Sequence, residues 1–237
     1  MLPQPPQNFP VPPPSEHALR SRRKWRALWI VGLVSVVCVI FMLWNAFNIQ
    51  RIKVATTEAH NNLRSLSCSL FEFDSRYGRY PDASTIAEVC QETGALLPSG
   101  AKTSNDFLRQ LLAAGIFQSE TVLYANIKGT HRPDNVFTPS HALEKGECGF
   151  SYIVGLSSKS NPGRPLVVTP LIPGTDRFDP VPFKGYAIVL RVDGGPTVLV
   201  LPITKNGEVI DSSGKHILDP TNPIWGGEKP VIAWPDL

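Results

Sequence analysis

The sequence lacks the short motifs that mark zinc, phosphate or nucleophile chemistry. Its 4 cysteines and 5 histidines show no CxxC or Cys/His spacing, which argues against a zinc site. The glycine pairs Gly194-Gly195 and Gly226-Gly227 lack phosphate-loop spacing and predict turns. The formal net charge is only +3, and the basic residues among residues 20–26 supply more than this excess. We therefore expect no nucleic-acid partner.

Charged residues are absent altogether from residues 27–47. A helix of about 21 residues is roughly 31 Å long, which matches the hydrocarbon core of a bilayer. Only Ser35, Cys38 and Asn45 interrupt the apolar surface, whereas a buried helix of a soluble protein usually carries a polar stripe. A cleaved signal peptide would have a shorter apolar core and a small-residue cleavage site. The pattern therefore predicts a transmembrane helix over residues 27–47.

Basic residues set the predicted orientation of this helix. They cluster before the apolar run, whereas only Arg51 and Lys53 follow it closely, and basic flanks tend to stay in the cytoplasm. We expect the N-terminus in the cytoplasm and the long C-terminal part on the other side of the membrane. Residues 1–26 are predicted to be a cytoplasmic tail, proline-rich and disordered first and basic afterwards.

The helix is expected to continue beyond the membrane, as an amphipathic section over residues 48–78. Apolar residues recur there at intervals of three and four, with no proline or glycine among them: Ile52, Ala55, Ala59, Leu63, Leu66, Leu70, Phe73 and Tyr77. We expect the following domain to cover this stripe; a parallel coiled coil with a second copy is the alternative. Gly78 can take the left-handed conformation that ends a helix.

An aromatic and acidic phrase closes this section and ends in Gly78-Arg79-Tyr80-Pro81. Together with the apolar N-terminal helix, it resembles the type II secretion pseudopilin family, especially the major, G-type member. In that family such a segment ends the long helix and leads the chain into a globular head. The resemblance covers roughly residues 27–82. It implies a pilin-like fold, a bacterial inner membrane with the C-terminal domain in the periplasm, and protein partners in a secretion or pilus-like assembly.

Two features of that family are missing. Its leader ends in a glycine followed by phenylalanine, and a glutamate lies in the apolar run, whereas here Gly32 is followed by Leu33 and no glutamate follows. We therefore expect the chain to keep its N-terminus and to remain in the membrane, with its entry into a pseudopilus open.

Residues 79–237 are predicted to form one head, which makes the fold class α+β. Two short helices are expected, one starting at Thr85 with a capping box to Glu88 and ending at Gly94, the other capped by Ser104 and ending at Gly115. Short β-branched or aromatic runs predict a small antiparallel sheet, with a hairpin between the fourth and fifth runs: residues 122–124, 150–154, 166–169, 186–192, 197–201 and 231–234.

Catalysis is not expected. The histidines are His17 in the tail, His60 on a helix, and His131, His141 and His216 in loops that we expect to be exposed to solvent. His141 with Cys148 as nucleophile and Asp134 as orienting group is conceivable, but no surrounding motif supports an anchored hydrolase.

Three cysteines lie outside the predicted span. Cys90 and Cys148 are a possible disulfide, because both lie in the globular part whereas Cys68 belongs to the long helix. The alternative is that all three stay free.

The family resemblance implies a calcium site in a loop near the C-terminus. Asp176 and Asp179 are the tightest acidic pair there, but Arg177 lies between them, and calcium needs six to eight converging oxygens. We assign no metal residues and expect no cofactor, with calcium as the possibility that the resemblance leaves open.

These observations predict a non-catalytic, single-pass membrane protein with a pseudopilin-like periplasmic domain. Its partners are expected to be the membrane and the proteins of a type II secretion or pilus-like assembly, with a homo-oligomer possible. The alternative is a stand-alone membrane-anchored binding module, which the missing glycine and glutamate favour.

Overall fold

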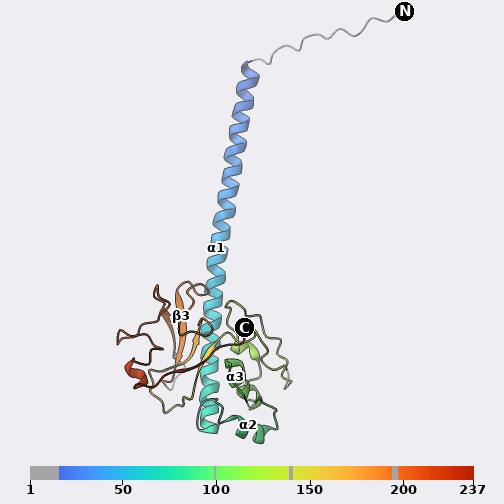
Figure 1. Ribbon diagram of the computed structural model, residues 1–237. Helices are drawn as coiled ribbons and strands as arrows, with labels where there is room; N and C mark the ends of the chain where they lie inside the picture. The colour runs from blue at the N-terminus through green and yellow to red at the C-terminus, as the bar shows by residue number, and fades with distance from the viewer. Residues whose placement is uncertain (1–15, 99, 139–140, 194–196) are drawn as a thin grey trace, which may run out of the picture. The chain divides into compact units, whose positions relative to one another are not determined.

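The computed structural model of the chain describes residues 16–98, 100–138, 141–193 and 197–237. The chain divides into two units, Met1–Gln50 and Arg51–Leu237. One helix, α1 (Glu16–Tyr77), contributes to both, and every other element belongs to the second unit (Figure 1).

α1 begins at Glu16, before the predicted start at residue 27. No proline occurs between Pro14 and Pro81, and the basic residues before the apolar run are good helix formers, so the helix extends through them. The proline-rich residues 1–15 lie outside the described part of the chain, where disorder stays a prediction.

The first unit contains a helix segment long and apolar enough to cross a membrane. An 18-residue window of α1 has a mean hydropathy of 2.0, and none of it is buried. Consecutive side chains such as Phe41, Met42 and Leu43 are all exposed, so the apolar surface extends around the whole helix. This exposure differs from that of a core helix in a soluble domain and fits a single membrane span.

The second unit contains a five-stranded antiparallel sheet in the order β4-β3-β2-β1-β5. The predicted sheet and the pairing of the two hairpin strands are thus confirmed, with Tyr186 opposite Pro202 and Leu190 opposite Val198. The predicted turn at Gly194-Gly195 lies outside the described residues. The strands are β1 (Ser151–Val154), β2 (Pro165–Thr169), β3 (Tyr186–Arg191), β4 (Val198–Pro202) and β5 (Val231–Ala233).

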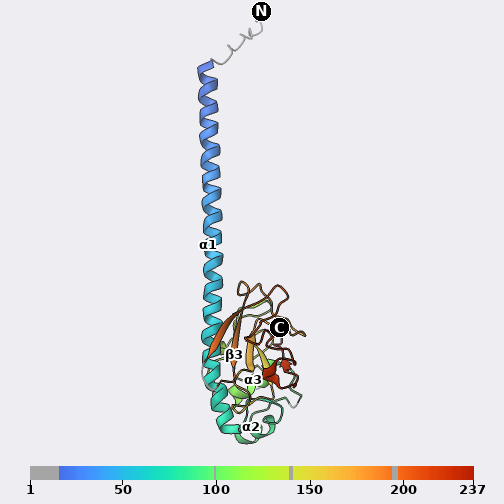
Figure 2. The ribbon, with the colours of Figure 1, turned by 90° about the vertical axis from the view of Figure 1, so that its left-hand side faces the viewer.

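The C-terminal half of α1 packs into the core of this unit, next to the sheet in both views (Figures 1 and 2). Leu63, Leu66, Leu70 and Phe73 are each 0% exposed and share one core with β2 and β3. Arg64 and Ser65, off the stripe, are exposed. The prediction that the following domain covers the stripe is confirmed.

α2 (Ile86–Thr93) ends at Gly94 as predicted, with a φ of 71°. The predicted capping box at its start is wrong, because Thr85 makes no side-chain cap. Its hydroxyl instead donates a hydrogen bond of 2.6 Å to Oε1 of Gln110. This buried contact joins α2 to the next helix.

α3 (Ser104–Ala113) is capped one residue earlier than predicted. Thr103, not Ser104, forms a capping box with Asp106.

The predicted strand over residues 122–124 is also wrong. Those residues belong mostly to a 3₁₀ helix, η1 (Glu120–Leu123), whose first turn is capped by Ser119. In a segment of three residues, the spacing of apolar side chains cannot distinguish a strand from a helix. A second 3₁₀ helix, η2 (Pro223–Trp225), precedes β5.

Candidate functional site

The residues considered for nucleophilic catalysis are not brought together. Nδ1 of His141 contacts the carboxylate of Glu144. Cys148 is buried, with its Sγ 3.6 Å from Oγ of Ser104, and burial raises the pKa of its thiol to about 11. A thiol with this pKa is a poor nucleophile near neutral pH.

Cys90 and Cys148 are free thiols in this structure, so the predicted disulfide is not formed. The Cys148 side chain lies in the core, where it donates to the carbonyl of Phe150 at 3.6 Å. Cys90 is only half-buried, on α2.

His216 corrects the expectation that the loop histidines are exposed. It is 5% exposed, accepts a hydrogen bond of 3.1 Å from the Val209 amide at Nδ1, and has Nε2 2.8 Å from the Asp176 carbonyl. His131 and His141 are exposed as expected. The buried histidine therefore has a structural role, joining two loops.

The C-terminal carboxylates weighed for calcium are engaged locally. Asp176 pairs with Arg177 at 3.2 Å, and Asp179 accepts from the Val181 amide at 2.9 Å. Asp211 accepts from Ser213 and Asn222. These contacts stabilise turns.

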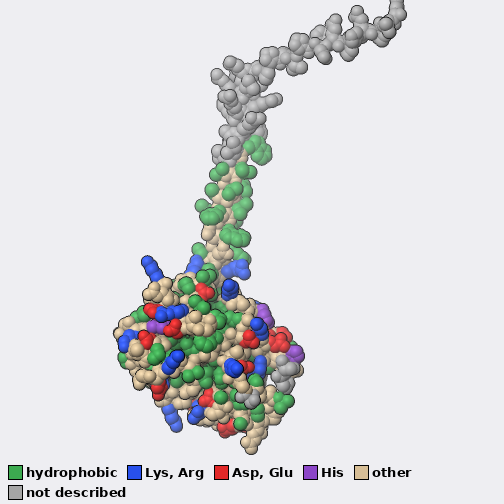
Figure 3. Space-filling view, in the orientation of Figure 1, with side chains coloured by type: hydrophobic (Ala, Val, Ile, Leu, Met, Phe, Trp, Pro, Cys, Tyr) green, Lys and Arg blue, Asp and Glu red, His purple; other side chains and the backbone are tan. Residues whose placement is uncertain are grey.

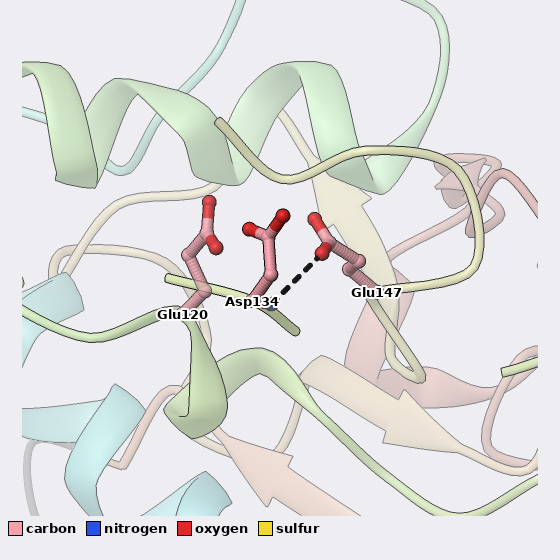
Figure 4. Close-up of side chains that lie close together, drawn as sticks. All are labelled: Glu120, Asp134 and Glu147. Carbon is pink, nitrogen blue, oxygen red and sulfur yellow. Dashed lines mark hydrogen bonds between the residues drawn. The ribbon is translucent and has the colours of Figure 1, made fainter. Parts of the chain in front are cut away.

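Three carboxylates from a different part of the head do converge: Glu120, Asp134 and Glu147, called the acidic cluster below. One oxygen of each lies within 4.8 Å of one oxygen of each of the others. Figure 4 shows the carboxylates side by side with Asp134 in the middle. Glu120 and Glu147 are buried, and Asp134 is exposed. The cluster is thus open to solvent at Asp134.

Hydrogen bonds from the surrounding loops position the acidic cluster. Oε1 of Glu120 accepts from the Leu143 amide at 2.6 Å. Oε1 of Glu147 accepts from the Asp134 amide at 3.2 Å, the dashed line in Figure 4. Oε2 of Glu120 is buried and has no hydrogen-bond partner among the described residues. A buried carboxylate oxygen without a partner is costly, at about 1–3 kcal/mol.

Electrostatic repulsion adds to that cost. Two unit charges 4–5 Å apart repel by about 3–4 kcal/mol at an effective dielectric constant of 20. Burial raises the pKa of Glu120, and the charges of Glu147 and Asp134 raise it further, while the hydrogen bond from the Leu143 amide opposes the shift. In the described part of the chain, none of the three carboxylates forms an ion pair.

The backbone beside the acidic cluster is strained. Asn135 and Leu143 have φ angles of 60° and 53°, a region that L-residues with a side chain rarely adopt. Asn135 accepts from the Glu120 amide through Oδ1 at 2.9 Å, and Leu143 donates to the Glu120 side chain. The strain therefore accompanies contacts that hold Glu120 in place.

The sequence does not predict the acidic cluster. Asp134 enters the sequence predictions only as an orienting group beside His141, and Glu120 lies next to a segment predicted as a strand. Glu120 begins η1 and the other two acids lie in separate loops, with no motif among the three, so no local signal could have grouped them.

A second feature of the head is an open groove beside the first turns of α1 that belong to this unit. Its charged wall is an ion pair of 2.9 Å between Arg132 and Glu58. The Arg132 guanidinium also lies 5.2 Å from the centre of the Tyr124 ring. The groove is lined by Lys53, Val54, Thr57, Glu58, Asn61, Asn62 and Arg132.

The groove and the acidic cluster are connected through residues that are close in the chain. Nδ2 of Asn62 on α1 donates to the carbonyls of Thr121 and Tyr124, at 2.9 and 2.8 Å. Thr121 follows Glu120 directly, and Arg132 lies two residues before Asp134. The loops that carry the acidic cluster are therefore tied to α1 beside the groove.

Comparisons of the chain with protein-family models, with curated proteins and with solved structures give no match.

Proposed function

We propose that this chain is a membrane-anchored protein whose extracytoplasmic head works by protein–protein contact, in or beside a type II secretion or pilus-like assembly, without catalysis of its own. One observation carries the proposal: α1 changes character along its length. Its apolar side chains are exposed as far as Phe47, whereas the apolar stripe from Ala55 onward is buried in the head.

The exposed apolar segment supports the membrane anchor. Burial of apolar surface is worth about 25 cal/mol per Å², so a helix with this surface is strongly favoured in a bilayer. In Figure 3 hydrophobic side chains follow the described apolar part of α1, while charged side chains are spread over the surface of the head.

The helix exit supports the resemblance to pseudopilins. Gly78 has a φ of 76°, and its amide donates to the Asp74 carbonyl at 2.7 Å, which ends α1. The amide of Tyr80 then donates to the Leu156 carbonyl, and the hydroxyl of Tyr152 donates to the Pro81 carbonyl at 2.9 Å. The Gly-Arg-Tyr-Pro phrase thus joins the long helix to the head.

The groove beside α1 is the surface that we assign to contact. It combines charged, amide and apolar groups, which suits a protein surface better than a small ligand. Lys53 and Val54 follow closely on the predicted span, so a partner held in the same membrane can reach them.

Site-specific photo-crosslinking in native membranes tests the proposal. A photoreactive residue replaces Val54 in the groove, which is 63% exposed. The matched control replaces Val181, which is 76% exposed on another loop of the head. We expect adducts from Val54 that contain secretion or pilus-like components, identified by mass spectrometry, and few from Val181.

Purification in mild detergent provides the second measurement. A stable complex with those components supports the proposal. A monodisperse lone protein without adducts at Val54 contradicts it, and favours the stand-alone binding module that the missing glycine and glutamate suggest.

A further inference from the structure

We propose that Glu120, Asp134 and Glu147 bind one calcium ion. Calcium takes six to eight oxygen ligands at 2.3–2.6 Å, so two oxygens on one ion lie at most about 5 Å apart. The ligand oxygens of the acidic cluster lie within 4.8 Å of one another. The three carboxylates are therefore close enough to share an ion.

The unpartnered oxygen of Glu120 is an independent sign of a missing ligand. Glu120 is 0% exposed, and its Oε2 has no hydrogen-bond partner among the described residues. Buried polar atoms in folded proteins nearly always have a partner. The carboxylate of Glu120 lies next to that of Asp134 in Figure 4, so a cation between them supplies the missing contact.

Among the residues that the structure describes, no side-chain cation fills this role. Arg132 pairs with Glu58, and Arg109 donates to the carbonyls of Ala142 and Leu143 at 2.7 and 3.1 Å. Both guanidinium groups lie on or against the surrounding loops, yet neither pairs with the cluster in the described part of the chain. The negative charge is left for an ion from solvent.

The ligand chemistry selects the ion. Three carboxylates without nitrogen or sulfur favour a hard cation. Calcium accepts irregular geometry, whereas magnesium requires a near-ideal octahedron at 2.0–2.1 Å. Exposed Asp134 gives the ion an entry path and leaves room for water ligands.

The site differs from the one that the family resemblance implies. The acidic cluster extends from the first residue of η1 to the loop before β1, outside the C-terminal loops. Its role follows from its neighbours: η1 is held to α1 by Asn62, and the loop of Asp134 is held to α1 by Arg132. An ion that joins these loops stabilises the wall of the groove.

Calcium titration of the full-length protein in detergent tests the proposal. The protein is stripped with a chelator, and binding of calcium chloride is measured by calorimetry together with the unfolding temperature. We expect saturable binding near one ion per chain and a higher unfolding temperature with calcium, and a smaller rise with magnesium at the same concentration.

Two variants localise the site. Asp134→Asn keeps the acceptor for the Val136 amide, and Glu120→Gln keeps the acceptor for the Leu143 amide. The control Asp179→Asn removes a carboxylate that accepts from the Val181 amide at the same distance, 2.9 Å, but has no acidic cluster around it. We expect at least tenfold weaker calcium binding in the two cluster variants and none of this loss in the control.

Three results would overturn the proposal. The stripped wild-type protein shows neither heat nor a shift in unfolding temperature with calcium. Both cluster variants bind calcium as tightly as Asp179→Asn. Magnesium gives a shift equal to that of calcium, which refutes the assignment of the ion.

Discussion

At the scale of single residues, Gly149 occupies a position with no room for a side chain. A Cβ at this position would lie 2.5 Å from the carbonyl oxygen of Ala125 and 2.6 Å from its nitrogen. Both are backbone atoms, so they cannot turn away as a flexible side chain can. The amide of Gly149 also donates to the Leu123 carbonyl at 3.0 Å, which holds the two segments together.

Gly149→Ala is therefore expected to lower the free energy of unfolding by about 1–3 kcal/mol, the usual cost of overpacking. Denaturant unfolding of the full-length protein in detergent measures it. Gly100→Ala is the control, because a Cβ there has nothing within 4 Å and its φ is ordinary. Equal losses in the two variants would contradict the prediction.

Cys148 is expected to resist alkylation in the folded protein. Burial raises the pKa of its thiol to about 11, and the reactive form is the thiolate. At pH 8, iodoacetamide should modify exposed Cys68 and should reach Cys148 only after denaturation. Peptide mass spectrometry distinguishes the two sites, and modification of both at one rate would refute the expected protection.

The same shift predicts the pH dependence of stability. The folded state binds the Cys148 proton more tightly than the unfolded state does. The resulting stabilisation is complete below the unfolded pKa of about 8.5 and is lost as the pH rises toward about 11. Unfolding of Cys148→Ala should show a shallower loss of stability over this range.

At the scale of elements, α1 holds the head together through its stripe. Leu66→Ala or Leu70→Ala should cost about 2–5 kcal/mol, because each side chain is fully buried and its removal leaves a cavity. Ser65→Ala, an exposed position on the same turns, should change stability little. Denaturant unfolding in detergent measures these losses, and values below about 1 kcal/mol at both leucines would show that the stripe does not support the core.

At the scale of the whole molecule, the predicted topology can be tested with fusions. A reporter active only in the cytoplasm should work before Pro3 and be silent after Leu237, because the basic residues precede the apolar run. Deletion of residues 27–47 should release the protein from the membrane fraction. Cytoplasmic activity of the C-terminal fusion would reverse the orientation.

Local sequence patterns alone determined most of the elements. The stripe from Ala55 to Tyr77, the stops at Gly78 and Gly94, and the pairing of β3 with β4 all follow from periodicity and backbone preference over a few residues. Such patterns involve only residues that are close in the sequence, because helix and strand place side chains at fixed intervals.

The tertiary structure decided what depends on residues distant in the chain. Thr85 donates a hydrogen bond to Gln110 and does not form the predicted helix cap, and His216 is buried between two loops. The tertiary structure also brought Glu120 of η1 together with Asp134 and Glu147 from two loops. The physical reason is that packing against α1 and the sheet sets the path of each loop. A short-range sequence pattern does not predict which distant residues a loop will contact.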